Sequence, residues 1–298
     1  GNGVRVRAAA ELTLIEDNWI GHNNDGITLE GDFTDICGNR IGLGEDDQPA
    51  GNRLEGVRVD GDDNRIGDGG FGCSGNVIGN NSSDGVQVSG NQNVISSNTI
   101  GGIPGIPAPN GNSGIFLAGG TSDSFVLSNL LFNNDNDGIR VASDAGLANR
   151  FVGNNFGGNG DQAIDLRDDG QTPNDAGDGD SGPNNLQNFP VIISVADIGG
   201  ALEVTYRIDS DSANASYPFA VDVYLNNSGE REGFRAFTDI YDQTPNSPRT
   251  FTFSPPVMAG FLVLMARDNA GNSSELGLVQ SYSVAPPPDQ IFSDRFEL

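Results

Sequence analysis

The stretch 84-DGVQVSGNQNVISSNTIGG-102 contains the unit that repeats through the first half of the chain. Its opening places an acid and a glycine before two apolar residues that are separated by one other residue. Six copies are present: 25-DGITLEG-31, 55-EGVRVDG-61, 84-DGVQVSG-90, 113-SGIFLAG-119, 137-DGIRVAS-143 and 162-QAIDLRD-168. Successive copies start 24–30 residues apart. A fixed period in this range indicates a solenoid, in which each repeat stacks on its neighbours.

The apolar positions of each copy, such as Val86 and Val88, alternate with period two. This is the pattern of a β-strand with one face inward, whereas a helix needs apolar residues three and four positions apart. A second motif of Asn, any residue and an apolar residue interleaves with the first: 18-NWIG-21, 39-NRIG-42, 76-NVIG-79, 98-NTIG-101, 129-NLLF-132 and 155-NFGG-158. Short strands wound once per repeat predict a parallel β-helix of about six to seven coils. The recurrent Asn is expected to bond the Asn of the next coil in a ladder.

The second position of the first motif is glycine in five copies and Ala163 in the last. We expect glycine there for its access to positive φ, which alanine lacks. The last copy also lacks the leading acid, as is typical of a terminal repeat.

These repeats make residues 4–166 resemble the right-handed parallel β-helix superfamily of bacterial secreted proteins. That superfamily includes pectate lyases, alginate epimerases and many surface proteins of uncharacterised function. The resemblance implies a right-handed β-helix over residues 1–166, but it implies no particular activity, because one fold hosts many functions.

The composition changes after residue 166. An Asp- and Gly-rich linker is expected at 167–187, and all five Tyr lie after residue 200. Seven strand-like runs follow within 188–285 and predict an immunoglobulin-like β-sandwich. The piece 266-ARDNAGNSSEL-276 resembles a strand end common in bacterial Ig-like surface modules. A Pro-rich spacer and tail occupy 286–298, and 291-IFSDRFEL-298 resembles a C-terminal signature of some proteobacterial secreted proteins.

The charge of the chain excludes some partners. The formal net charge is −26, and all 15 basic residues are Arg. A nucleic-acid binder needs cations for the phosphates, so no nucleic-acid partner is expected. No apolar run approaches the length that spans a bilayer, so membrane insertion is not expected. The excess of Asp fits an extracellular or bacterial cell-surface protein that binds Ca²⁺.

The linker supplies the candidate metal ligands, which are Asp168, Asp169, Asp175, Asp178 and Asp180. Alternating carboxylates can converge on one or two Ca²⁺ ions that lock the junction between domains. The alternative is a solvated, flexible linker. The spacing differs from that of an EF-hand, which places a Glu at the twelfth position.

The outward residue of each strand offers a second candidate site. Arg58 and Arg140 with Phe116 could grip an acidic polysaccharide, by carboxylate contact and by stacking. The alternative is an ordinary solvated sheet face. The leading acids of the copies would repel one another unless they were solvated or bridged by cations, and ordinary Asp-Gly turn chemistry is the simpler interpretation.

The two cysteines, Cys37 and Cys73, precede the same Gly-Asn motif in successive coils. Adjacent coils bring them near disulfide distance, and an extracellular location permits oxidation. Two buried free thiols are the alternative.

No catalytic residues can be assigned from the sequence. His22 is the only histidine and lies in a turn, and mechanisms with a Lys base are excluded because the chain has no Lys. An Arg-based, Ca²⁺-assisted lyase mechanism stays open. The leading hypothesis is an extracellular structural or adhesive protein that associates end to end into filaments. The alternatives are a carbohydrate-active β-helix enzyme of the lyase or epimerase type, and a binding protein for acidic polysaccharide.

Overall fold

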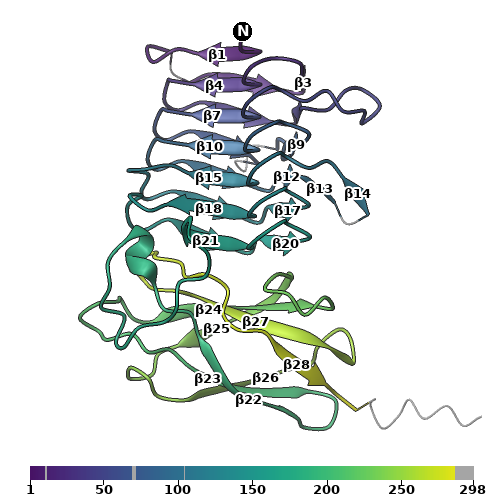
Figure 1. Ribbon diagram of the computed structural model, residues 1–298. Helices are drawn as coiled ribbons and strands as arrows, with labels where there is room; N and C mark the ends of the chain where they lie inside the picture. The colour runs from purple at the N-terminus through teal and green to yellow at the C-terminus, as the bar shows by residue number, and fades with distance from the viewer. Residues whose placement is uncertain (11, 69–71, 104, 286–298) are drawn as a thin grey trace, which may run out of the picture.

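The computed structural model describes all residues except 11, 69–71, 104 and 286–298. The tail singled out above therefore lies outside the described residues. The first half of the chain is a stack of coils, and the second half lies across the end of that stack (Figure 1).

Each coil contributes one strand to each of three parallel sheets. The first sheet consists of β1 (Val4–Val6), β4 (Ile27–Leu29), β7 (Val57–Val59), β10 (Val86–Val88), β15 (Ile115–Leu117), β18 (Ile139–Ala142) and β21 (Ile164–Arg167). The second consists of β2 (Leu14–Glu16), β5 (Asp35–Cys37), β8 (Arg65–Gly67), β11 (Val94–Ser96), β16 (Phe125–Leu127) and β19 (Arg150–Val152). The third consists of β3 (Trp19–Ile20), β6 (Arg40–Ile41), β9 (Val77–Ile78), β12 (Thr99–Ile100), β17 (Leu130–Phe132) and β20 (Asn155–Gly157).

The predicted inward rows form the core of the coils. Val86 pairs with Val57 on one side and Ile115 on the other, and Val88 pairs with Val59 and Leu117. All of these side chains are 0% exposed. Burying an aliphatic side chain of this size contributes about 1.5–3 kcal/mol, so the stacked rows hold the coils together.

The motif glycines are required by close packing, and the expectation of positive φ is wrong. None of the five motif glycines is among the glycines with positive φ. A Cβ on Gly85 would lie 2.6 Å from the carbonyl oxygen of Gly114 in the next coil and 2.6 Å from Ile100 Cγ2. Ala163 is tolerated in the last copy because no further coil stacks on it.

Buried asparagines connect the coils, as predicted. Asn39, Asn76, Asn98 and Asn129 each donate from Nδ2 to the Oδ1 of the next Asn, at 2.9–3.0 Å. The ladder ends on Asn154 rather than on Asn155, so the motif is shifted by one residue in the last coil. Asn52, Asn81, Asn110, Asn134 and Asn159 form a second ladder.

A disulfide links two coils of the stack, and a hairpin projects from it. The structure joins Cys37 of β5 to Cys73 in the following coil by a disulfide with a Cα–Cα distance of 5.9 Å. A small antiparallel hairpin of β13 (Gly102–Ile103) and β14 (Ile106–Pro107) projects from the third sheet (Figure 1).

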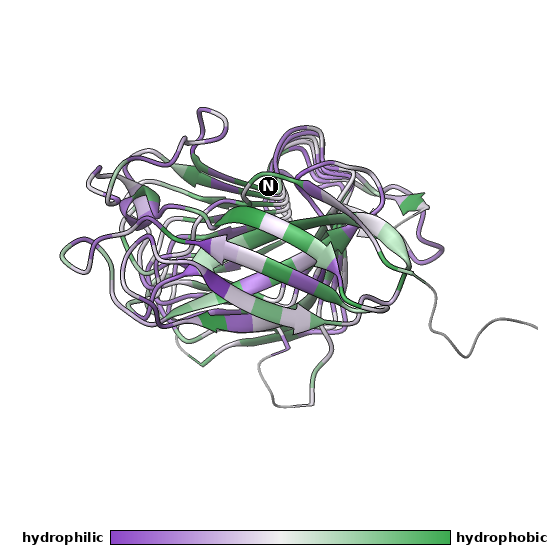
Figure 2. Ribbon diagram, turned by 90° about the horizontal axis from the view of Figure 1, so that it is seen from below, coloured by the Kyte–Doolittle hydropathy of each residue, from purple (hydrophilic) through white to green (hydrophobic). Residues whose placement is uncertain are grey.

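The second half begins with a 3-10 turn, η1 (Pro183–Leu186), and continues as two antiparallel sheets. One sheet has β22 (Val191–Asp197), β23 (Leu202–Arg207) and β26 (Arg249–Phe253). The other has β25 (Phe234–Tyr241), β24 (Phe219–Asn226), β27 (Ala259–Arg267) and β28 (Gln280–Ser283). These C-terminal sheets share one core, and hydrophobic and polar residues alternate along their strands (Figure 2). The short η1 turn is the only helix in the described part, and no helix there could cross a membrane.

The C-terminal sheets close the end of the β-helix. Gly233 pairs with Phe156 of β20, Ser273 Oγ accepts from the Phe151 amide of β19 at 2.9 Å, and Glu275 accepts from the Leu166 amide of β21 at 2.9 Å. Tyr224 and Met265 join the core of the coils. The second half thus reaches the last strand of each parallel sheet and satisfies part of the backbone that an open end would expose.

Candidate functional site

Two rows of side chains run along the outer side of the first sheet. The outward positions of its strands form the first-sheet face: Arg5, Thr28, Arg58, Gln87, Phe116, Arg140 and Asp165. The residues that lead each repeat form the acid row: Asp25, Glu55, Asp84, Ser113, Asp137 and Gln162. In each coil the amide of the motif glycine donates to the carbonyl of the acid-row residue in the next coil, so the row is stacked in register.

The acid row is mostly buried, so solvation is not what keeps its stacked carboxylates from repelling one another. Asp25, Asp84 and Asp137 are 6%, 3% and 1% exposed, respectively. Asp84 Oδ1 accepts from the Ser113 amide at 3.0 Å, and Asp137 Oδ1 accepts from the Gln162 amide at 3.0 Å. Asp84 and Asp137 therefore each reach the backbone of the next coil.

Arg140 connects three coils on this face. Its guanidinium donates to Asp84 Oδ2 at 3.3 Å, to Asp168 Oδ2 at 3.0 Å and to Ser113 Oγ at 3.1 Å. It also lies over the ring of Phe116, 3.9 Å from the ring centroid. Burial raises the pKa of Asp84, and the charge of Arg140 opposes that rise. Arg140 and Phe116 thus form one stacked unit rather than two separate contacts for a ligand.

Three carboxylates converge beside Arg140 at the end of the row. Asp137, Asp165 and Asp168 each place one carboxylate oxygen within 4.8 Å of the others. Asp165 is 3% exposed and accepts from the amides of Asp169 and Gly170. Burial raises the pKa of Asp137 to about 6, and the charges of Asp165, Asp161 and Asp168 add to the rise. Burial also raises the pKa of Asp165. Such a cluster suits a bound cation, which would stabilise the charged carboxylates.

Asp25 and Glu55 form a second carboxyl pair at the other end of the row. Glu55 has a raised pKa, because of its burial and because of its hydrogen bond to Asp25. Thr28 Oγ1 donates to Asp25 Oδ2 at 3.2 Å, while Asp25 Oδ1 is buried and has no partner among the described residues.

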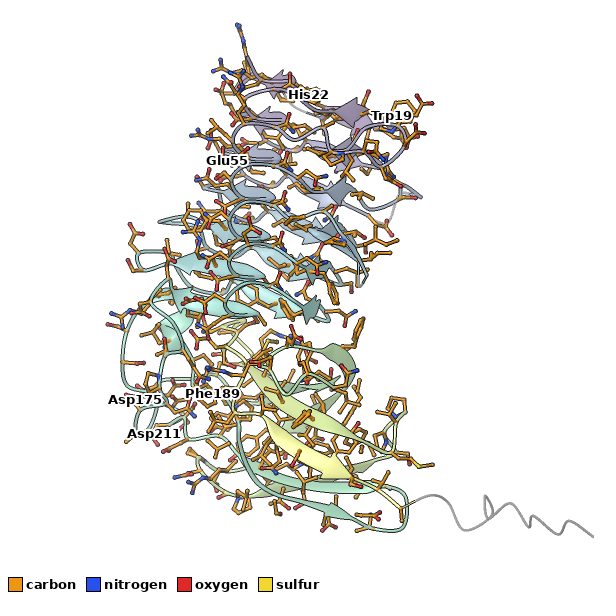
Figure 3. The ribbon with its side chains drawn as sticks, turned by 45° about the vertical axis from the view of Figure 1, so that its right-hand side comes forward. Trp19, His22, Glu55, Asp175, Phe189 and Asp211 are labelled. Atoms are coloured by element: carbon orange, nitrogen blue, oxygen red, sulfur yellow. A yellow bond between two sulfur atoms is a disulfide. The ribbon has the colours of Figure 1, made fainter. Side chains whose placement is uncertain are left out.

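The five aspartates predicted to bind metal do not form one cluster. Asp168 joins Asp137 and Asp165, and Asp169 pairs with Arg167 at 3.6 Å. Asp175, Asp178 and Asp180 converge separately, again within 4.8 Å. This junction cluster lies beside the C-terminal sheets, where Figure 3 places Asp175 near Phe189 and Asp211.

The junction cluster is built around Asp178, which is 2% exposed. Its carboxylate accepts from the Asn188 amide at 2.9 Å, from Ser210 Oγ at 2.6 Å and from the Gln187 side chain. Burial raises its pKa to about 6, and the charges of Asp180 and Asp175 contribute. These contacts order the turn around Asp178, in a segment for which the sequence had left a flexible linker as the alternative.

Arg58 and His22, the other residues considered from the sequence, lie away from the carboxylate cluster. Arg58 lies on the first-sheet face, where its Nε donates to Asp60 Oδ1 at 3.1 Å. His22 lies in a coil turn near the N-terminal end, far along the stack from the carboxylate cluster (Figure 3). Sequence reasoning missed Asp137 as a site residue, because an Asp-Gly pair also occurs in simple turns. It missed Asp165 because an outward strand residue also occurs on an ordinary solvated sheet face.

Comparison with known proteins supports the fold. Residues 50–175 match the family model described as a right handed beta helix region. No curated protein matches the chain. A solved double mutant of a periplasmic alginate epimerase is 18% identical, with a TM-score of 0.39, over 55% of this chain and 34% of that one.

Two further structures belong to tailspike protein 2 of an Escherichia coli O157:H7 bacteriophage. The full-length protein is 10% identical with a TM-score of 0.35, over 95% of this chain and 50% of that one. Its enzymatically active domain is 9% identical with a TM-score of 0.34, over 95% of this chain and 66% of that one. The chain thus spans less than two thirds of each of these proteins. The family match and the three parallel sheets identify the N-terminal part of the chain as a right-handed β-helix of about six turns.

Proposed function

We propose that the first-sheet face binds an acidic polysaccharide, with Ca²⁺ held by Asp137, Asp165 and Asp168. The observation that carries this proposal is the convergence of these three carboxylates beside Arg140, two of them almost fully buried. A rigid structural rod needs no buried carboxylates, and burying a charge costs stability unless the charge is compensated. We therefore prefer this proposal to the structural or adhesive hypothesis.

Calcium fits both the site and the charge of the chain. Ca²⁺ takes six to eight oxygen ligands from carboxylates, carbonyls and water, so three aspartates leave positions open for a ligand. A chain of net charge −26 repels a polyanion. A cation held on the surface by protein carboxylates would bridge to the carboxylate of a sugar and so reverse the local sign of the interaction.

Arg140 supplies a fixed positive charge next to the cluster. Its stacking on Phe116 and its bonds to Asp84 and Asp168 hold the guanidinium in one orientation. Arg58 is half-exposed on the same face, two strands from β15, and could contact the next part of an extended chain. A linear polymer that runs along the stack would meet these groups in order.

The same residues support turnover of an acidic sugar. A cation on the sugar carboxylate acidifies the adjacent ring proton, and a protein base then accepts it. Elimination would expel the neighbouring glycosidic oxygen and leave an unsaturated sugar. Asp137, Asp165 and Asp168 would be committed to the cation, so the proton acceptor would be another group of the first-sheet face, as in an Arg-based mechanism, and the expelled oxygen would take a proton from water.

The proposal is tested with native protein and a panel of polysaccharides. Polygalacturonate and alginate should bind in millimolar Ca²⁺ and dissociate in EDTA, whereas a neutral polymer such as dextran should not bind. Ultraviolet absorbance of unsaturated uronate in the same samples reports turnover. Equal binding with and without Ca²⁺, or binding to dextran alone, would contradict the proposal.

We also propose that the protein works outside the cytoplasm, since disulfides persist in oxidising compartments. The pairing order β22-β23-β26 and β25-β24-β27-β28 supports an immunoglobulin-like sandwich for 188–285, because sequential strands divide between two sheets in the way that such domains do. This supports the division into a β-helix at 1–166, a linker at 167–187 and a sandwich at 188–285, with the tail at 286–298 outside the described residues.

A further inference from the structure

A polar cavity of about 370 Å³ lies where the last coil meets the C-terminal sheets. One wall is the turn 158–163, which connects β20 to β21, and the other is 230–232, in the loop between β24 and β25. The Gly158 amide donates to Glu232 Oε2 at 2.6 Å, and Gly233 bridges to Phe156. The two walls are therefore tied together, and the cavity is preformed at the small end of the range of ligand pockets.

Two donors at this cavity lack partners. Arg231 Nη1 and Gln162 Nε2 are buried, and neither has a hydrogen-bond partner among the described residues. Both residues line the cavity. A buried donor without an acceptor lowers stability, and more so if it is charged, so an oxygen-bearing ligand would recover this loss.

Arg231 is the one basic residue among those that line the cavity. No ion pair joins it to a carboxylate in the described part of the chain. The buried Glu275 carboxylate, on which the Arg231 charge acts, already accepts from the Leu166 and Thr172 amides.

The cavity also carries acceptors and is continuous with the acid row. Asp161 and Glu230 are exposed carboxylates in its lining, suited to receive hydroxyl groups. Gln162 is the last position of the acid row, and its amide donates to Asp137. A polymer on the first-sheet face would thus reach the cavity directly after the carboxylate cluster.

We propose that this cavity is a subsite for one uronate unit, with the sugar carboxylate on Arg231 and Gln162 and the sugar hydroxyls on Asp161 and Glu230. This assignment rests on the proposed function for the class of ligand. It adds a defined end to the binding surface, because the C-terminal sheets block the path beyond the cavity.

The test measures binding of a galacturonate trimer by titration calorimetry in the presence of Ca²⁺. Arg231→Gln, which keeps the length and polarity of the side chain, should weaken trimer binding by about tenfold or more, as expected for one charged hydrogen bond. Gln162→Leu should weaken it less. Arg207→Gln, at an exposed arginine on β23, is the matched control and should bind as the native protein does.

Thermal unfolding of each variant separates lost binding from lost folding, and the trimer should raise the Tm of native protein but not of Arg231→Gln. If Arg231→Gln binds the trimer as tightly as native protein does, the subsite proposal is wrong. Loss of polymer binding in Asp168→Asn would in that case still support binding at the first-sheet face. Loss of trimer binding in Arg231→Gln with native polymer binding in Asp168→Asn would instead support the cavity and contradict the calcium cluster. If Arg231→Gln fails to fold, an unchanged trimer affinity in Gln162→Leu overturns the subsite.

Discussion

Asp137 shows how a single residue links stability to the proposed site. Its carboxyl accepts from Gln162 and Ser113 at 1% exposure, and three further aspartates lie near it. The sequence favoured ordinary Asp-Gly turn chemistry at the leading acids, whereas Asp84 and Asp137 accept from the backbone of the next coil. The contact between Arg140 and Asp84 could not be predicted, because the two residues lie 56 positions apart in the sequence.

The raised pKa of Asp137 predicts a pH-dependent effect of Asp137→Asn. The folded state holds the proton more tightly than the unfolded state, so this group lowers stability as pH rises from about 4 to about 6. At pH 7 without Ca²⁺, removing this carboxylate should raise the free energy of unfolding by about 1 kcal/mol after allowance for solvent screening. The variant should therefore melt about 2–4 °C higher than native protein. The gain should vanish at pH 3.5. A lower Tm at pH 7 would contradict this account.

At the scale of elements, the asparagine ladders fix the spacing of the coils. Asn98 donates to Ile66 O at 2.8 Å and to Asn129 Oδ1 at 3.0 Å, and it accepts from both nitrogens of Asn76. Asn98→Ala leaves several buried groups unpaired and should lower the free energy of unfolding by about 2–4 kcal/mol in denaturant titration.

The matched control is Asn18→Ala, at the exposed first rung of the same ladder. It should cost less than about 1 kcal/mol, because water replaces the lost partner. Equal losses in the two variants would show that burial does not set the strength of the ladder.

The linker continues the β-helix for one further rung. Asn184 of η1 accepts from the Asn149 amide at 2.9 Å and donates to Asn149 O at 2.7 Å, as the next coil would do. Sequence composition indicated a junction rich in Asp and Gly but not this ordered turn, because the partners lie in the coils and not in the linker.

The junction cluster of Asp175, Asp178 and Asp180 stays a predicted Ca²⁺ site. Asp175 Oδ1 and Asp180 Oδ1 are buried without partners among the described residues. Millimolar Ca²⁺ should raise the Tm of native protein, and Asp180→Asn should reduce that rise. Asp168→Asn reports separately on the carboxylate cluster of the first-sheet face. If EDTA leaves the Tm of calcium-loaded protein unchanged, neither of the two proposed Ca²⁺ sites stabilises the fold.

For the whole molecule, the important feature is the closure of the β-helix by the C-terminal sheets. The strands of both halves could be predicted from hydrophobic alternation, and all seven C-terminal strands lie where expected. How the halves meet could not be predicted. The piece 266-ARDNAGNSSEL-276 resembles a strand end of surface modules, yet Ser273 and Glu275 within it pair with the last coil.

This closure bears on self-association, which stays a prediction. The second half contacts the last strand of each parallel sheet, by a bridge to β20 and by side-chain hydrogen bonds to β19 and β21, and so obstructs strand addition at that end. We therefore expect end-to-end association to involve the first coil.

The most direct measurement is the affinity for polygalacturonate as a function of free Ca²⁺, in native protein, Asp168→Asn and Asp123→Asn. Asp168 is the exposed member of the carboxylate cluster. Asp123 is an exposed aspartate of another coil, and it lies just before β16 of the second sheet. Native protein and Asp123→Asn should bind only when Ca²⁺ is present, and Asp168→Asn should need about tenfold more Ca²⁺ for the same binding. Identical calcium dependence in all three proteins would contradict a calcium-bridged polysaccharide site at Asp137, Asp165 and Asp168.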